Sequence, residues 1–295
     1  MAGLGWIPFL PRKMIVWLSR RIGDLAWLCS KKLRRVAEAN VALVFGETAD
    51  PAARSRMLRN CYRHFALMVL DLLWFSRKAE SRLAAWVHWE ADAAPVFEPG
   101  AQLMLTAHYG NWETLGQAYA ARGQPIFSVA APLKNPRVDA RFLALRQQTG
   151  QKIIPQQGAA RKLLQGLKQG HKLAVLLDQN TQPEAGGVFV PFFGLPVPVS
   201  SVPAALALKT GAAVIPVVCV PDAAGHYTVR VFPQLVADPA AADPVRALTE
   251  QMTQAIESVI REMPEYWCWM YKRWKYIPEG ESAARYPHYA RRISG

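Results

Sequence analysis

The spacing of apolar and polar residues changes near residue 96. From there, short apolar runs alternate with segments whose apolar residues recur every three or four positions. Runs of the first kind are typical of buried strands and the second of helices, so the alternation predicts βαβ units. The expected strands are 102–107, 125–130, 152–154, 173–178, 213–220 and an edge strand at 226–232, and the expected helices lie near 136–148, 159–168, 202–210 and 243–262. We predict a single α/β domain with a mostly parallel central sheet flanked by helices and preceded by N-terminal helices.

The segment before the sheet also shows helical spacing. Helices are expected over 34–45 and 52–75, the first of them ending before a glycine. Within residues 1–30 two apolar runs are interrupted by cations, so no window is long enough to span a bilayer, and no cleavage site suggests a signal peptide. A helical stripe nevertheless recurs there, made of Met14, Leu18, Ile22, Leu25 and Cys29.

Tryptophans and cations cluster around that stripe, with Trp6, Trp17 and Trp27 beside several lysines and arginines. Such a mixture favours the interface of a bilayer. We predict a membrane-interface helical segment over 1–30, removable without unfolding the rest, and an α/β domain over 31–295. An ordinary first helix docked on the core is the alternative.

Charge narrows the partners further. The 295 residues contain 35 Lys and Arg against 22 Asp and Glu, a formal net charge of +13, and ten tryptophans. A basic surface suits an anionic membrane, an acidic partner or substrate, or nucleic acid, but nothing resembles a nucleic-acid-binding module. The four cysteines lie far apart without metal or redox spacing, so we expect reduced thiols in the cytoplasm.

Candidate chemistry sits directly after the strand expected at 102–107. There the chain turns polar at His108 and reaches Glu113 at the start of the next helix. A carboxylate bonded to one imidazole nitrogen leaves the other basic, which gives a general base for a hydroxyl. Gly110 would let the turn tighten and leave room for substrate. A chance pairing of a histidine with an acid is the plain alternative.

Two later segments could bind a substrate, a carrier or the membrane. Residues 180–200 read as a long loop, and its apolar part, 188–193, could line an acyl-chain pocket or simply pack. Near the C-terminus, cations and tryptophans interleave, and we expect them to face lipid phosphates or an acidic carrier at the bilayer: Arg261, Trp267, Trp269, Lys272, Arg273, Trp274 and Lys275.

The turn and four further stretches resemble one family. The histidine, four residues and glutamate of 108–113 resemble the motif of the glycerolipid acyltransferase superfamily, and most closely that of the late acyltransferases of lipid A biosynthesis (the lauroyl/myristoyl transferase family). Agreement in order and spacing continues through 133–139 with Arg146, 177–179 with 187–194, 264–275, and the N-terminal helices at 35–40 and 45–47. The acid-Gly-Thr-Arg motif of the phosphatidic-acid branch is absent from the sequence, which argues against a simple glycerol-phosphate acceptor.

The resemblance implies an O-acyltransferase in which Glu113 orients His108 as the base that activates a hydroxyl of a lipid A precursor or related glycolipid. It adds Arg146 and Asp178 to the site, either as site residues or as a salt bridge beside it. Asn111 and Lys134 could donate to the oxyanion, and no metal or cofactor is implied.

Acyl carrier protein is the expected thioester donor, with coenzyme A as the alternative, and the expected location is the cytoplasmic face of the bacterial inner membrane, peripheral or monotopic. An acyltransferase acting on a lysophospholipid or aminolipid, and a non-catalytic lipid-binding scaffold, remain open. Nucleic-acid binding would rest on charge alone.

Overall fold

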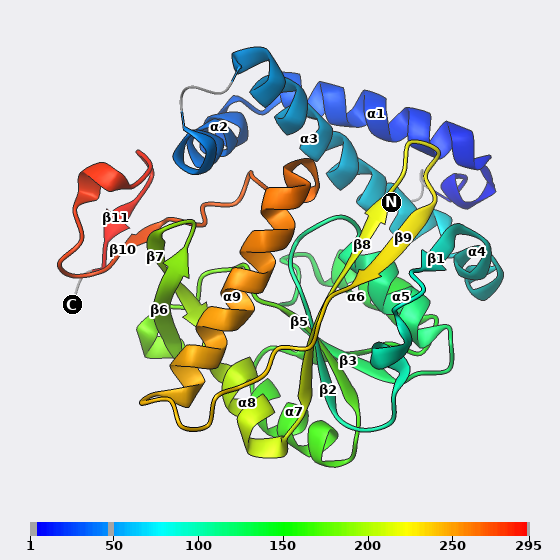
Figure 1. Ribbon diagram of the computed structural model, residues 1–295. Helices are drawn as coiled ribbons and strands as arrows, with labels where there is room; N and C mark the ends of the chain where they lie inside the picture. The colour runs from blue at the N-terminus through cyan, green and yellow to red at the C-terminus, as the bar shows by residue number, and fades with distance from the viewer. Residues whose placement is uncertain (1–4, 47–49, 294–295) are drawn as a thin grey trace.

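A seven-stranded sheet forms the centre of the computed structural model, which describes residues 5–46 and 50–293 (Figure 1). Its strands, in spatial order, are β1 (Val87–Trp89), β9 (Tyr227–Val231), β8 (Ala213–Pro221), β2 (Gln102–Thr106), β5 (Lys172–Leu176), β3 (Ile126–Ala130) and β4 (Lys152–Pro155). Only β8 and β9 pair antiparallel among these neighbours. The predicted α/β domain with a mostly parallel sheet is confirmed.

Helices cover both faces of the sheet, as its continuous apolar strands require. In β2 every residue is buried, and the side chains alternate between two apolar layers. Leu103 and Leu105 join the layer of α9 (Pro244–Glu262), whereas Met104 joins the layer of α5 (Trp112–Ala120). The helices around the sheet are α4 (Ala79–Trp86), α5 (Trp112–Ala120), α6 (Pro136–Gln147), α7 (Ala159–Lys168), α8 (Val202–Thr210) and α9 (Pro244–Glu262).

Three N-terminal helices lie across one end of the sheet, at the top of Figure 1: α1 (Arg12–Cys29), α2 (Lys31–Phe45) and α3 (Pro51–Trp74). Helices α1 and α3 approach closely, because a Cβ on Gly23 would lie 2.5 Å from the Cα atom of Arg63. The first residue of α1, Arg12, is 5% exposed and forms a buried ion pair with Asp71 of α3. Helix α1 is therefore packed into the body of the protein.

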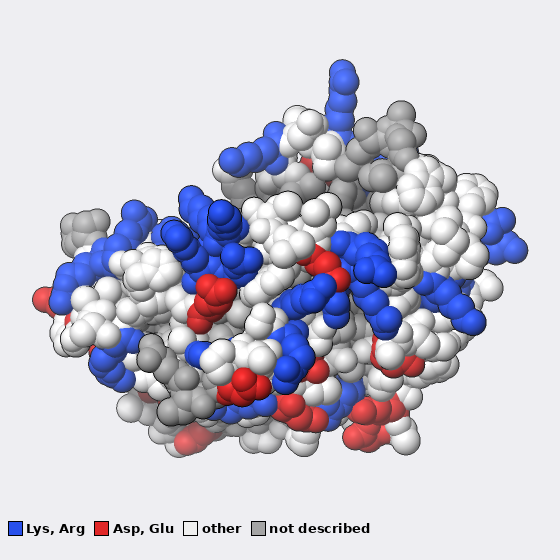
Figure 2. All heavy atoms as spheres, turned by 90° about the horizontal axis from the view of Figure 1, so that it is seen from above, with Lys and Arg blue, Asp and Glu red and all other residues white. Residues whose placement is uncertain are grey.

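Apolar side chains lie on both the inner and the outer side of α1. Ile15, Val16 and Trp27 are buried on the inner face. The outer side carries exposed apolar side chains at Met14, Trp17, Ile22, Leu25 and Leu28, between 44% and 64% exposed. Figure 2 looks down on this side of the molecule and shows lysines and arginines distributed among uncharged surface. In the described ranges, no helix has the length and apolar character needed to cross a membrane.

Within residues 180–200, where the sequence suggested a loop, residues 187–200 form a hairpin. Strands β6 (Gly187–Phe192) and β7 (Leu195–Ser200) pair antiparallel around Phe193 and Gly194, which both have positive φ. Val190, Phe192 and Phe193 are buried, so packing accounts for them, while Val188 and Phe189 remain half-buried. The chain ends in a small parallel pair, β10 (Tyr276–Ile277) and β11 (Arg291–Arg292).

Strand β9 is not at the edge of the sheet, contrary to the prediction for 226–232. The three-residue strand β1 pairs with its outer side, with Val87 opposite Tyr227. A strand of three residues is too short to show a period in the sequence, and it follows directly after helix α4.

Candidate active site

The carboxyl ends of β2 and β5 bring His108 and Asp178 together. These strands are parallel neighbours, with Thr106 opposite Leu176, and each functional residue follows its strand by two positions. The carboxyl ends of neighbouring parallel strands meet at one edge, which is where open α/β sheets bind ligands. The prediction that Asp178 emerges beside His108 is confirmed.

Asp178, not Glu113, is the acid bonded to the imidazole. Nδ1 of His108 lies 2.8 Å from Oδ1 of Asp178, and the backbone N–H of His108 donates to Oδ2 at 3.0 Å. The indole N–H of Trp267 donates to the same Oδ2 at 2.9 Å. The carboxylate therefore fixes the tautomer that carries its proton on Nδ1, leaving the lone pair on Nε2. The prediction that Glu113 is bonded to the imidazole of His108 is wrong, because Asp178 takes that position.

The pKa values of this pair move in opposite directions. Burial would lower the pKa of His108, but the charge of Asp178 and its hydrogen bond outweigh burial, with a smaller contribution from Glu113, and the pKa is raised. Burial would likewise raise the pKa of Asp178, yet the charge of His108 and the hydrogen bonds from His108 and Trp267 hold it below its usual value. An ionised, fully buried carboxylate next to a histidine is the arrangement that stabilises an imidazolium.

Glu113 forms a separate ion pair with Arg146 of α6. The guanidinium donates from Nε to Oε2 at 2.8 Å and from Nη2 to Oε1 at 2.5 Å, and the Glu113 side chain is 8% exposed. Glu113 stands in the first turn of α5, where a helix stabilises negative charge. Arg146 is thus joined to Glu113, and the salt bridge considered between Arg146 and Asp178 does not form.

The open side of the imidazole is partly exposed. The side chain of His108 is 24% exposed, and Trp112 packs edge-on against it with ring centroids 4.9 Å apart. On the far nitrogen, Nε2 of Gln179 lies 3.2 Å from Nε2 of His108. Gln179 and Trp267 are two contacts of the site that the sequence analysis did not assign, although both lie within motifs of the resemblance.

Gly110 is required by the backbone and leaves no room for substrate. Its φ is +57°, and a Cβ there would lie 2.1 Å from the carbonyl oxygen of Cys219. The same oxygen accepts the backbone N–H of Asn111 at 2.8 Å, and the N–H of Gly110 donates to Tyr266 at 2.9 Å. The turn is therefore bonded to the end of β8 and to the C-terminal segment, and the space beside Gly110 is filled.

Asn111 is occupied as a helix cap, not placed as a free donor. Its Oδ1 accepts the N–H of Thr114 at 2.9 Å, and its Nδ2 donates to the hydroxyl of Tyr227 at 2.8 Å. That hydroxyl donates to Asp71 at 2.5 Å, and Asp71 pairs with Arg12. A buried chain of polar side chains thus runs from the start of α1 to the cap of α5, and it contradicts the expected oxyanion role of Asn111.

Lys134 lies on the surface beside the site. It is exposed in the loop between β3 and α6 and lines a surface depression with Asn135, Pro136 and Arg137. Because β3 is the neighbour of β5 in the sheet, this loop leaves the same edge as Asp178. Lys134 is available to a ligand, and its role as an oxyanion donor stays a prediction.

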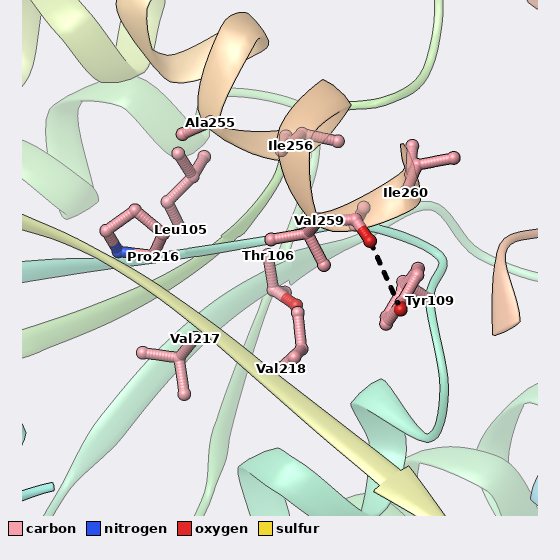
Figure 3. A pocket seen from close by; sticks show the side chains of 11 residues that line it. Leu105, Thr106, Tyr109, Pro216, Val217, Val218, Ala255, Ile256, Val259 and Ile260 are labelled. Atoms are coloured by element: carbon pink, nitrogen blue, oxygen red, sulfur yellow. Dashed lines mark hydrogen bonds between the residues drawn. The ribbon is translucent and has the colours of Figure 1, made fainter. Parts of the chain in front are cut away.

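A small apolar cavity lies beneath the turn that follows β2, between β2, β8 and α9 (Figure 3). Tyr109 closes it on the side of the turn, and its hydroxyl is bonded to the carbonyls of Met263 at 2.9 Å and Val259 at 3.4 Å. The cavity measures about 10 Å³. That is roughly the space of one water molecule, so it does not accept an acyl chain in this conformation.

The C-terminal group of tryptophans is buried, contrary to the expectation that it faces a membrane or a carrier. Trp267, Trp269 and Trp274 are at most 1% exposed, and Arg273 is 0% exposed. Arg273 donates to Oδ1 of Asn180 at 2.9 Å, and burial lowers its pKa to about 10. These residues form the packing behind Asp178, so only the outer cations of that segment remain on the surface.

No three His, Cys, Asp or Glu side chains within residues 5–46 and 50–293 are grouped so that they could hold a metal ion. Two ionisable pairs lie at this edge, His108 with Asp178 after β2 and β5, and Glu113 of α5 with Arg146 of α6.

Comparison with known proteins shows the family of this chain. A family model described as bacterial lipid A biosynthesis acyltransferase matches residues 1–276. The chain belongs to this family, which confirms the resemblance. The lipid A biosynthesis lauroyltransferase of Escherichia coli (strain K12) is 24% identical over 94% of this chain and 91% of its own length. The palmitoleoyltransferase of the same pathway and strain is 25% identical over 95% and 92%.

Another group of relatives shares a shorter stretch. A phosphatidylinositol mannoside acyltransferase of Mycolicibacterium smegmatis is 30% identical over 59% of this chain, and the chain spans only 57% of that relative's length. Among solved structures, the 1-acyl-sn-glycerophosphate acyltransferase PlsC of Thermotoga maritima overlaps with a TM-score of 0.40 and 13% identity, over 86% of this chain and 99% of that one. This overlap is too loose to support an inference.

Proposed function

We propose that the protein is an O-acyltransferase that moves a fatty acyl group from a thioester donor to a hydroxyl of a lipid A precursor or related glycolipid. The observation that carries this proposal is the pairing of His108 Nδ1 with the buried Asp178, at 2.8 Å, at the carboxyl edge of the sheet. It leaves a basic Nε2 on a partly exposed side chain, which is what the activation of a hydroxyl needs.

The reaction follows from this geometry. His108 Nε2 removes the proton of the acceptor hydroxyl while Asp178 stabilises the imidazolium that forms. The alkoxide oxygen attacks the thioester carbonyl, and a tetrahedral intermediate results. Its collapse breaks the carbon–sulfur bond, and the imidazolium returns its proton to the leaving thiolate. The products are an ester and a free thiol, and no covalent enzyme intermediate is needed.

Glu113 and Arg146 act on charge in this proposal. Glu113 contributes to the raised pKa of His108 without touching it, because its carboxylate oxygens are bonded to Arg146. The ion pair therefore adds almost no net charge beside the base, and its two hydrogen bonds hold both side chains in place. Removing either partner would leave a largely buried charge unpaired, which is costly.

Two groups of relatives support a glycolipid acceptor. Those aligned over nearly the whole chain are named for lipid A biosynthesis, and those with 30% identity are named for a phosphatidylinositol mannoside. Both names denote glycolipids, so we assign the hydroxyl to that class and lipid A precursors as its first candidate.

Acyl carrier protein is the proposed donor. The net charge is +13, and exposed cations stand at the catalytic edge, among them Lys134, Arg137 and Arg141. An acidic carrier is attracted by such a surface, which raises the association rate more than the affinity. A coenzyme A thioester also carries phosphates and is the alternative donor.

The outer side of α1 supports attachment to a membrane. Exposed Trp17, Leu25 and Leu28 lie beside exposed Arg20 and Arg21. Apolar side chains set among cations are typical of a helix that lies in the interface of an anionic bilayer. We place the protein at the cytoplasmic face of the bacterial inner membrane, attached without crossing it.

The test measures acyl transfer with purified protein, a lipid A precursor and an acyl thioester, with the lipid product identified by mass spectrometry. His108→Ala should lower kcat/KM by at least about 100-fold, as expected for loss of a general base. His288→Ala is the matched control, since His288 is exposed near the C-terminus. Transfer at the wild-type rate by His108→Ala would refute the proposal.

The pH profile identifies the orienting acid. Because the base must be neutral and its pKa is raised, kcat/KM should rise as pH passes upward through that pKa. Asp178→Asn removes the larger Coulombic cause, so the limb should move to lower pH while the plateau falls. Glu113→Gln should move the limb less. A larger shift in Glu113→Gln would return the orienting role to Glu113.

A further inference from the structure

The side chain of Gln179 is hydrogen-bonded to Nε2 of His108, the nitrogen that the proposed reaction needs. Its amide Nε2 lies 3.2 Å from Nε2 of His108. Since the Nδ1 proton of the imidazole is directed to Asp178, Nε2 carries the lone pair, and an amide N–H of Gln179 donates to it. In the state described here the base is therefore already bonded.

A nucleophile cannot share that position. A hydroxyl has to come within about 2.6–3.2 Å of the base to pass its proton. The single lone pair of Nε2 accepts one good hydrogen bond, and it lies in the plane of the ring. The amide has to leave before either an acceptor hydroxyl or a water molecule can be activated.

The side chain of Gln179 is free to leave, whereas the backbone around it is fixed. Asp178, the residue before it, is buried and holds three hydrogen bonds. Asn180, the residue after it, donates from its backbone N–H to the hydroxyl of Tyr271 at 3.0 Å and from Nδ2 to the carbonyl of Lys272 at 3.0 Å. Gln179 itself is exposed, so its side chain can rotate away without disturbing the dyad.

We propose that Gln179 is a removable cap on His108 that withholds the base from water until a glycolipid hydroxyl displaces it. This inference rests on the proposed function, because it assigns His108 as the base. Without the cap, water could take the acceptor's place: it would lose a proton to Nε2, attack the thioester and yield a fatty acid and a free thiol. The donor would then be hydrolysed without any ester being formed.

Binding energy explains why the cap selects for the acceptor. Displacing one neutral hydrogen bond costs about 1 kcal/mol, which corresponds to a factor of roughly five in rate. A glycolipid held by many contacts remote from the hydroxyl offsets such a cost easily, whereas a single water molecule has no other contacts to draw on. The cap therefore slows hydrolysis and hardly affects transfer.

The test compares two rates in the full-length protein. Hydrolysis is followed as free thiol released from lauroyl-coenzyme A without acceptor, and transfer as acylated lipid formed with a lipid A precursor. Gln179→Ala should raise hydrolysis by about 3- to 10-fold and change transfer by less than about twofold. Gln157→Ala, at an exposed glutamine in the loop after β4, is the matched control and should leave both rates unchanged.

A second variant reads the contact itself. Gln179→Glu would place a carboxylate beside Nε2, stabilise the imidazolium and raise the pKa of His108. The rising limb of both pH profiles should therefore move to higher pH, a result that a role in packing alone would not produce. An unshifted limb would mean that residue 179 does not contact the base.

The outcomes separate this inference from the proposed function. If His108→Ala retains transfer, the proposed base is wrong, whatever Gln179 does. If His108→Ala is inactive and Gln179→Ala hydrolyses the thioester no faster than the wild type, the cap alone is refuted. Loss of both activities in a Gln179→Ala protein with a native melting temperature would also refute it, because Gln179 would then be required for catalysis.

Discussion

The two ends of the chain both combine tryptophan with cations, and the fold uses them in opposite ways. In α1, Trp17 is 53% exposed on the outer side, whereas Trp27 is buried on the inner side. Near the C-terminus Trp269 and Trp274 are 0% exposed, and so is Arg273 between them. Composition does not distinguish these segments. What distinguishes them is that α1 is a regular helix with an inner and an outer side, whereas the C-terminal segment is irregular.

An irregular segment has to satisfy its backbone by contact with the rest of the protein. The C-terminal segment does so through α2, where Nδ2 of Asn40 donates to the carbonyls of Trp269 and Tyr271, each at 2.8 Å. Its aromatic side chains fill the space behind Asp178 as a consequence. Tryptophan and cations together therefore indicate a membrane surface only where a regular element can direct them outward.

Deleting residues 1–30 should have the largest effect on the free energy of unfolding. The deletion removes Arg12 and leaves Asp71 buried without its ion-pair partner, which costs about 3–5 kcal/mol, in addition to the buried apolar side chains of α1. Most domains are stable by only about 5–15 kcal/mol. We expect loss of the cooperative melt, in contrast to the separable segment that the sequence suggested. A cooperative melt near the wild-type temperature would restore that interpretation.

Trp269→Ala should cost about 3–5 kcal/mol, as for other buried tryptophans. Its ring is 0% exposed and its Nε1 donates to the carbonyl of Pro264 at 2.6 Å. The matched variant at the other end, Trp17→Ala, should change the free energy of unfolding by less than about 0.5 kcal/mol. Urea denaturation of both proteins measures the difference. Equal losses would abolish the contrast between the two ends.

Leu25→Ser with Leu28→Ser should weaken binding to vesicles that contain anionic lipid. A leucine moved fully from water into the bilayer contributes about 1.5–3 kcal/mol. Leu25 and Leu28 are 61% and 64% exposed, so each can contribute only part of that value. For the two substitutions together we expect at least about a tenfold loss of vesicle binding. Co-sedimentation measures it, and the melting temperature should not change. Leu133→Ser is the control, because this leucine is 41% exposed but lies between β3 and α6. Unchanged sedimentation would mean that α1 does not contact the bilayer.

Substituting surface cations should have the smallest effect, and it should depend on where they lie. Lys134→Gln with Arg137→Gln, at the catalytic edge, should lower kcat/KM for an acyl carrier protein donor by roughly 3- to 10-fold at low salt, and less at physiological salt, where the Debye length is about 8 Å. Lys272→Gln with Lys275→Gln, both half-buried, should change it by less than about twofold. The reverse order would place the carrier at the C-terminal segment.

Much of the fold could be predicted because its strands are continuous apolar runs that end in polar residues. The runs around Leu103 and Leu173 gave strands of nearly the right bounds, and parallel pairing then placed His108 and Asp178 at one edge. The hairpin at 187–200 could not be predicted in this way. Its strands contain Pro191, Pro196 and Pro198, and prolines lower the expectation of a strand.

The partner of His108 shows where sequence spacing misleads. Glu113 is five residues away, but the start of α5 turns its side chain to Arg146. Asp178 is 70 residues away and reaches the imidazole because β5 is the neighbour of β2. Strand order is a property of the whole sheet, so spacing along the sequence favours Glu113 although Asp178 is the acid bonded to the imidazole.

The buried chain of hydrogen bonds through Arg12, Asp71, Tyr227 and Asn111 also fixes the distance between α1 and His108. Because the first residue of α1 is joined through this chain to the cap of α5, α1 cannot move independently of the site. With α1 lying on the bilayer as proposed, the height of His108 above the lipid head groups is a constant of the fold. The acceptor has to carry its hydroxyl up to that level, so the length of its polar head, as well as its chemistry, decides which hydroxyl is acylated.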